Sequence, residues 1–262
     1  MDRVLRERAR AWSLAGDLAE RVELLAAARR RGDQEAERAL RLAAYLGQAE
    51  AREALGLPTH VRCARLEGCV IDLDAGRGEV RGQHDLACPL PSLFKLERWL
   101  SDLEGYGAEV LVRAALATAR RALEWWDRLQ GWQTVEAGGV LTLEHHHYLE
   151  WSDESRHRRP RLLLEAVERY LLEPTPERRR LIEELPPAEL DERPFKHLGG
   201  LVACLEGGEL SPAHLTVIAT AQFLPEEKLV RGAVVEALVP WALGLVDPLR
   251  GLARLPEPRR AG

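Results

Sequence analysis

Apolar residues recur at helical spacing through residues 108–126, and this pattern constrains the fold more than any other in the chain. The residues on this face are Ala108, Leu111, Val112, Ala115, Ala119, Ala122, Leu123 and Trp126. Because so many of them are alanines, we expect a neighbouring helix to approach closely. A second helix is predicted over residues 160–172, since Pro160 suits a first helical turn. The residues between, 131–159, are predicted to form an irregular connection.

The rest of the chain is also predicted to be mostly helical. Further helices are expected within residues 3–57, with breaks at Gly16-Asp17 and Gly32-Asp33, and near residues 91–104, 176–185, 194–205, 212–223 and 225–243. Residues 59–90 differ, because His60–Cys63 and Cys69–Leu73 have β-like patterns. We therefore predict an all-α fold, a helical array or bundle of short antiparallel helices, with a small β-like insertion around residues 60–85.

This pattern also predicts the domain organisation. The predicted parts are an N-terminal helical module (1–58), the β-like insertion (59–90), a main helical domain (91–255) and a frayed tail (256–262).

Charge and composition limit the cellular setting. The net charge of −5 does not favour nucleic acid as a general partner. The longest nearly apolar run, residues 233–246, contains Glu236 and Pro240 and is too short for a membrane span. Four cysteines are too few to stabilise a chain of 262 residues through disulfide bonds. The N-terminus has no apolar region of the kind that a signal peptide contains. We expect a soluble, cytoplasmic protein with reduced thiols and no membrane partner.

Two sets of residues have spacings that a metal site uses. His60 and Cys63, and His84 and Cys88, have pairwise spacings that zinc ligands adopt. The alternative is ordinary packing, because cysteine often behaves as a small buried hydrophobic residue. His145 and His147 would share one face of a strand, but an exposed polar segment is the alternative. We favour a protein without a cofactor and keep zinc as an open possibility.

No catalytic motif is evident in the sequence. Asp72 and Asp74 follow an apolar pair, as in phosphotransfer enzymes that hold magnesium, but those enzymes need alternating strands and helices downstream. A turn-forming pair is the favoured interpretation. The sequence also lacks a phosphate-binding loop, a dinucleotide fingerprint and a nucleophile elbow. These observations favour a protein that is not an enzyme.

Aromatic and charged residues gather in and after the predicted connection. Arginine and tryptophan are enriched at interaction hot spots, and an acidic segment can block a basic surface. The alternatives are aromatic residues that cap the core and charged residues on solvated faces. The candidate partner-binding residues are Trp132, Tyr148, Trp151, Arg156, Glu183 and Glu184.

Two segments together resemble a known family. Residues 112–126 (VRAALATARRALEWW) and 159–171 (RPRLLLEAVERYL) resemble a helical family of bacterial immunity proteins from polymorphic-toxin systems. The resemblance covers about residues 108–172, and the helix around residues 42–47 looks like an N-terminal module of related bacterial proteins. The resemblance implies a non-catalytic helical protein that binds a toxin.

We therefore expect a non-enzymatic protein-interaction module, and specifically an immunity protein that neutralises a cognate toxin. A structural or adaptor scaffold of a larger bacterial assembly and a zinc-binding helical protein are the alternatives. The expected partner is another protein.

Overall fold

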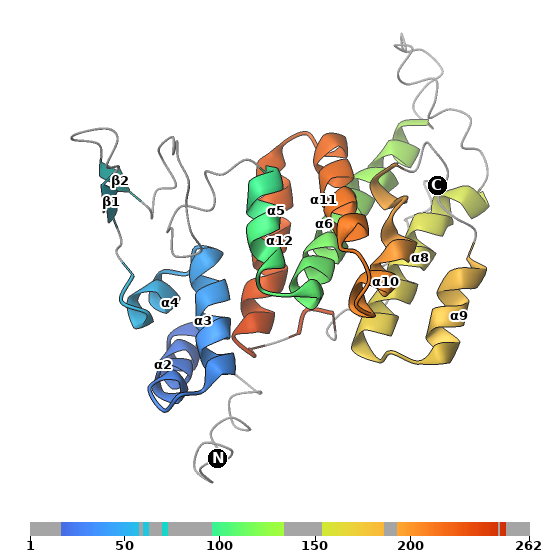
Figure 1. Ribbon diagram of the computed structural model, residues 1–262. Helices are drawn as coiled ribbons and strands as arrows, with labels where there is room; N and C mark the ends of the chain where they lie inside the picture. Colours follow the sequence, from blue (N-terminus) through green and yellow to red (C-terminus); the bar gives the residue numbers. More distant parts are fainter. Residues whose placement is uncertain are drawn as a thin grey trace. The chain divides into compact units, whose positions relative to one another are not determined.

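The computed structural model describes residues 17–57, 60–62, 70–72, 96–133, 154–185, 193–245 and 247–249 (Figure 1). Helices dominate the described chain, so the predicted all-α fold class is confirmed. None of the described helices combines the length and the apolar character that a membrane span requires.

The chain divides into two compact units. Unit 1 spans Met1–Tyr106 and Val235–Gly251, and unit 2 spans Gly107–Val234 and Leu252–Gly262. Helix α12 (Glu227–Ala242) contributes residues to both units. The predicted domain boundaries at residues 58, 90 and 255 stay predictions.

Short helices joined by tight turns build unit 1. Its other helices are α2 (Leu18–Arg29), α3 (Gln34–Tyr45), α4 (Ala49–Ala54) and α5 (Leu96–Glu104). The predicted break at Gly32-Asp33 is confirmed. Gly32 has a φ of 87°, which glycine adopts without steric cost. The Asp33 carboxylate then accepts hydrogen bonds from the N–H groups of Glu35 (3.0 Å) and Ala36 (3.1 Å), and so caps α3.

Buried aromatic residues hold α5 against α3. The hydroxyl of Tyr45, at the end of α3, donates a hydrogen bond to Asp102 Oδ2 of α5 at 3.1 Å. The rings of Tyr45 and Tyr106 lie 5.8 Å apart. The Tyr106 hydroxyl donates a hydrogen bond to the Arg41 carbonyl oxygen at 3.3 Å. Tyr106 follows α5 and Arg41 belongs to α3, so this hydrogen bond also links the end of α5 to α3. These contacts satisfy polar groups that would otherwise be buried without partners.

Tyr106→Phe is expected to reduce the loss of stability that the protein suffers above pH 10. Burial is the main cause that raises the pKa of Tyr106 to about 12; the Arg41 charge opposes the shift and Asp102 adds to it. The unfolded value is 10.0. The pKa of Tyr106 is higher in the folded protein than in the unfolded protein. The stability that the protonated Tyr106 contributes is therefore complete below pH 10 and is lost as pH rises through about 12. The shift corresponds to at most about 3 kcal/mol.

Urea unfolding of both proteins at pH 7 and pH 11 measures this effect. At pH 7 we expect the variant to be less stable by about 1 kcal/mol, because it lacks the hydrogen bond to Arg41. At pH 11 the difference in the free energy of unfolding between the variant and the unchanged protein should become smaller or change sign. An identical loss of stability in both proteins between the two pH values would contradict the assignment.

A pair of short strands lies within the predicted β-like insertion. Strands β1 (His60–Arg62) and β2 (Val70–Asp72) are antiparallel, with His60 opposite Asp72 and Arg62 opposite Val70. The predicted β-like character is confirmed for these residues.

Longer helices build unit 2. Its helices are α6 (Ala108–Gln133), α8 (Glu154–Leu172), α9 (Pro176–Glu184), the 3-10 turns η2 (Arg193–Phe195) and η3 (Leu198–Gly200), α10 (Leu201–Leu205) and α11 (Ser211–Phe223). Helix α6 packs mainly against α11 and also contacts α8 and α10, while α9 lies beside α8 (Figure 1).

Helix α6 is buried more widely than the sequence predicted. The predicted face is confirmed, since Ala115, Ala119 and Ala122 have no exposed surface. Leu116 and Thr118, which lie off that face, are also fully buried. The Thr118 hydroxyl donates to the Ala115 carbonyl oxygen at 2.9 Å, so a polar side chain is accommodated there without an unsatisfied donor. The small alanine side chains allow the close helix packing that this burial requires.

Trp126 anchors the core of unit 2. Its side chain is 1% exposed, and its ring meets Phe195 of η2 edge to face at a centroid distance of 5.4 Å. Phe223, the last residue of α11, lies 6.4 Å away. Trp125, one step round the helix, is only partly buried. The predicted core position of Trp126 is confirmed.

The prediction of an irregular connection over residues 131–159 was wrong at both ends. Helix α6 continues through Gly131 to Gln133, and α8 begins at Glu154, six residues before Pro160. A proline inside a helix removes one hydrogen bond, but it does not prevent a turn from forming before it. Gly131 is tolerated because extending an existing helix is easier than starting one.

The single helix predicted over residues 194–205 was also wrong. The chain forms two 3-10 turns before α10 begins at Leu201. A Cβ atom on Gly200 would lie only 2.9 Å from Cβ of Pro212. The chain therefore approaches α11 too closely here for a larger residue, and this contact between distant segments is not visible in helical periodicity.

Candidate functional site

The predicted aromatic partner-binding residues cannot be assembled into a site from the described chain. Trp132 belongs to the last turn of α6, and Arg156 to the first turn of α8. Their side chains, like all of Tyr148 and Trp151, lie outside the described residues. Their roles in partner binding stay predictions.

The predicted acidic pair, Glu183 and Glu184, lies exposed at the end of α9. Arg179 donates from Nε to Glu183 Oε1 at 2.9 Å. It also donates from Nη1 to both carboxylate oxygens of Glu206, at 2.9 Å and 2.8 Å. The Tyr170 hydroxyl donates to Glu206 Oε1 at 2.7 Å, and this hydrogen bond raises the pKa of Tyr170. The charge of Glu183 is thus partly neutralised within a network that holds α9 beside α8.

The predicted metal ligands are also largely outside the described chain. His60 starts β1, but its side chain is not described. Cys63, His84, Cys88, His145 and His147 lie outside the described residues. Among the side chains that are described, no group of three or more histidine, cysteine, aspartate or glutamate residues is placed to hold a metal ion.

Cys204 is a core residue of unit 2. Its side chain has no exposed surface, and Sγ lies 3.1 Å from the Glu209 carbonyl oxygen. Burial raises the pKa of the Cys204 thiol. A buried thiol that is held in its protonated form is a poor nucleophile and a poor metal ligand.

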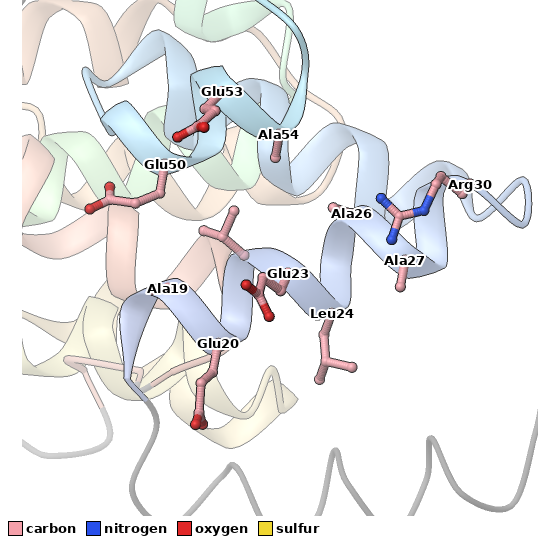
Figure 2. A pocket seen from close by; sticks show the side chains of 11 residues that line it. Ala19, Glu20, Glu23, Leu24, Ala26, Ala27, Arg30, Glu50, Glu53 and Ala54 are labelled. Atoms are coloured by element: carbon pink, nitrogen blue, oxygen red, sulfur yellow. The ribbon is translucent and has the colours of Figure 1, made fainter.

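The described residues of unit 1 form a groove between α2 and α4. Its volume is about 930 Å³, within the range of about 300–1,000 Å³ that binding pockets occupy. Figure 2 shows its lining side chains, which come from α2 and α4. They are Ala19, Glu20, Val22, Glu23, Leu24, Ala26, Ala27, Arg30, Glu50, Glu53 and Ala54.

Packing on α3 creates this groove. Helices α2 and α4 both contact α3 and each other. Val22 and Ala26 of α2 are among the lining residues, but they are only 3% and 7% exposed and present little apolar surface to the groove. Arg29 Nη1 donates to the Ala54 carbonyl oxygen at 3.1 Å, which ties the C-terminal ends of α2 and α4 together. This hydrogen bond fixes the width of the groove at one end.

The rim of the groove is acidic. Glu20 and Glu23 come from α2, and Glu50 and Glu53 from α4; all four are exposed. Within the described part of the chain, none of the four carboxylates takes part in an ion pair or a hydrogen bond. Arg30 is the one basic residue among the described residues that line the groove. The described lining of the groove therefore carries more acidic than basic side chains.

The glutamates of this groove are not among the site residues that were predicted from the sequence. The i, i+3 spacing of Glu20 and Glu23, repeated by Glu50 and Glu53, places each pair on one side of its helix. That spacing was visible in the sequence. What was not visible is that α2 and α4 would both pack on α3 and bring these two pairs to the lining of one groove.

The arrangement suits recognition of a positively charged surface. Exposed carboxylates attract a basic partner surface at long range. Comparison of the sequence with protein-family models found no match, and comparisons with curated proteins and with solved structures likewise found none.

Proposed function

We propose that this chain is a non-enzymatic protein-interaction module that acts as an immunity protein and neutralises a cognate bacterial toxin. The observation that carries the proposal is the groove between α2 and α4, whose described lining has four exposed glutamates and one basic residue, Arg30. The resemblance of residues 112–126 and 159–171 to immunity proteins supplies the class of partner.

The charge of the groove supports this kind of inhibition. A toxin that attacks nucleic acid must present a basic surface to the phosphate backbone. An acidic surface on the inhibitor competes for that basic surface, and the opposite charges accelerate association. Such inhibition requires only a complementary surface and no chemical step.

Co-expression tests this proposal directly. Each gene that flanks the coding sequence is expressed in a bacterial host, alone and together with the full chain. We expect one product to stop growth when expressed alone, and growth to return to that of uninduced cells when the chain is present. The two proteins should then co-purify as a complex of fixed stoichiometry.

The control is a co-expressed protein of similar size and net charge, which should not protect the cells. The proposal fails if no flanking product is toxic, or if a toxic product kills equally well in the presence of the chain. Protection without a complex would also contradict it, because the proposed mechanism is direct binding.

A further inference from the structure

We propose that helix α9 is a strap that opens from unit 2 and closes again while the other helices of the unit stay folded. Exposed ionic contacts of Arg178 and Arg179 hold the strap in its closed position beside α8 (Figure 1). This conformational property goes beyond the proposed function and concerns a different part of the chain from the groove.

Helix α9 buries very little apolar surface. Of its nine residues, all of which the structure describes, Ile182 is the one that is buried, with 6% of its surface exposed. The adjacent residue, Leu181, is 58% exposed. Helix α8 is the one described element against which α9 packs extensively. Because burial of an apolar face supplies most of the stability of a packed helix, α9 gains little stability from packing.

Arg179 forms the first ionic contact that holds α9 closed. Its Nη1 donates to both carboxylate oxygens of Glu206, at 2.9 Å and 2.8 Å. Glu206 is the residue at the C-terminal end of α10, and the Tyr170 hydroxyl of α8 donates to the same carboxylate. The side chains of Arg179 and Glu206 are 50% and 33% exposed. Since water and ions reach this pair, it stabilises the closed position only weakly.

Arg178 forms the second ionic contact. Its Nη1 donates to the carbonyl oxygen of Arg169 in the last turn of α8, and its Nη2 pairs with the Glu173 carboxylate. The guanidinium group therefore lies at the C-terminal end of α8, where the helix dipole favours a cation. The Glu173 side chain is 65% exposed, so salt screens this pair as well.

The contacts that start α9 belong to the strap itself. Thr175 Oγ1 accepts a hydrogen bond from the N–H group of Arg178 at 3.3 Å, and Pro176 occupies the first helical position. These contacts can stay in place when α9 leaves α8. A helix of nine residues is marginal in water on its own, however, so its backbone amides exchange with solvent while the strap is open. Opening of α9 is therefore measurable as fast local hydrogen exchange.

Hydrogen–deuterium exchange of the full chain, followed by mass spectrometry, tests the proposal. Peptides from residues 177–184 report on α9, and peptides from residues 212–223 of α11 are the reference, because α11 packs against α6. We expect α9 to exchange faster than α11 at low salt. At about 0.5 M salt, the exchange of α9 should accelerate by about two- to fivefold, while that of α11 should not change.

Matched variants identify the contact that holds the strap. Arg179→Met removes the pairs with Glu206 and Glu183 and should accelerate the exchange of α9 by about two- to fivefold. Arg180→Met makes the same change of side chain and net charge at an exposed residue of α9 that takes no part in these contacts. Glu183→Gln removes only the pair within α9. Both controls should accelerate exchange clearly less than Arg179→Met, and unchanged exchange of α11 confirms that the fold is retained.

Three results would overturn the inference. Exchange of α9 as slow as that of α11 at both salt concentrations would mean that the helix does not open separately. Equal acceleration by Arg179→Met and Arg180→Met would mean that the contact with Glu206 does not hold α9 closed. Joint acceleration of α8 and α9 would mean that the two helices open together, so that α9 is not a strap.

Discussion

Trp126→Ala is expected to lower the free energy of unfolding by about 3–5 kcal/mol. The Trp126 ring is 1% exposed and packs edge to face against Phe195, with Phe223 close by. Removing it eliminates a large buried apolar area and leaves a space that α6 and α11 cannot fill, because interiors relax only partly around a cavity. It also removes the aromatic pair with Phe195, which adds to the loss beyond area alone.

Urea unfolding followed by far-UV circular dichroism measures this loss. Trp125→Ala is the matched control, because it removes the same side chain one position away on the same helix, where burial is only partial. We expect the control to cost much less than the Trp126 variant. Equal costs would show that Trp126 is not the anchor of this core.

The helical fold could be predicted because its signals are local. The alanine and leucine spacing through residues 108–126 identifies a buried helix without knowledge of its neighbours. Asp33 caps a helix through hydrogen bonds to residues two and three positions away, so its role is also readable from nearby sequence. Such signals locate helices and turns correctly.

Features that depend on distant segments could not be predicted. Position 200 requires glycine because the chain lies close to Pro212. Two 3-10 turns replace part of the helix that was predicted there. Helix α8 begins at Glu154, six residues before Pro160, although a proline usually marks a first helical turn. Neither outcome follows from local propensity.

The candidate site was missed for the same reason. Glu20 and Glu50 were each visible as exposed helical residues, but their convergence depends on how α2 and α4 pack on α3. Sequence analysis instead selected rare residue types, such as the histidines at residues 145–147. Rare residue types indicate unusual chemistry, but this groove is lined mostly by glutamates and alanines, which are common. Only the packing of the helices brings these residues together.

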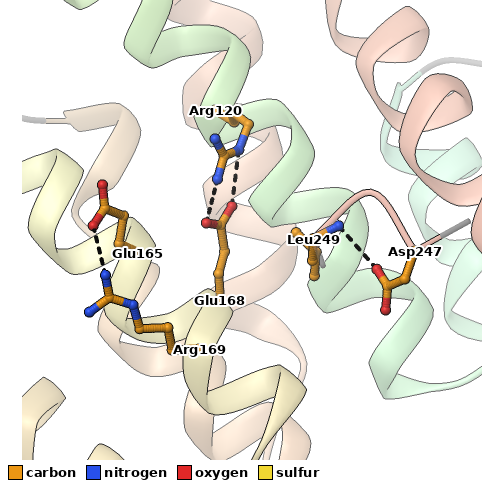
Figure 3. A network of polar contacts seen from close by, with 6 residues as sticks. All are labelled: Arg120, Glu165, Glu168, Arg169, Asp247 and Leu249. Atoms are coloured by element: carbon orange, nitrogen blue, oxygen red, sulfur yellow. Dashed lines mark hydrogen bonds and ion pairs between the residues drawn. The ribbon is translucent and has the colours of Figure 1, made fainter. Parts of the chain in front are cut away.

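An ion pair between α6 and α8 shows how strongly a distant contact can affect stability. Arg120 of α6 donates from Nε to Glu168 Oε1 at 3.1 Å, and its Nη2 donates to Oε2 (Figure 3). The side chains are only 17% and 8% exposed. Burial raises the pKa of Glu168, while the hydrogen bonds and charge of Arg120 oppose that shift. Arg120 therefore favours the charged form of the Glu168 carboxyl group against the effect of burial.

Arg120→Met is therefore expected to cost about 3–5 kcal/mol at pH 7, because it leaves Glu168 buried without its cation. Methionine keeps most of the apolar stem of arginine, so the loss comes mainly from the missing charge and hydrogen bonds. The double variant Arg120→Met/Glu168→Leu should recover most of this stability, since neither charge is then buried. The four proteins form a double-mutant cycle whose coupling energy isolates the pair.

The pH dependence of the Arg120→Met variant distinguishes an uncompensated charge from a packing defect. Without Arg120, the pKa of Glu168 in the folded state should rise further above its ordinary value of 4.5. A carboxyl group whose folded pKa is raised binds its proton more tightly in the folded state, so stability falls as pH rises through that pKa. The cost of the substitution should accordingly be smaller at pH 5 than at pH 8. A cost that is the same at both pH values, together with a double variant that is no more stable than Arg120→Met, would show that the pair contributes through packing alone.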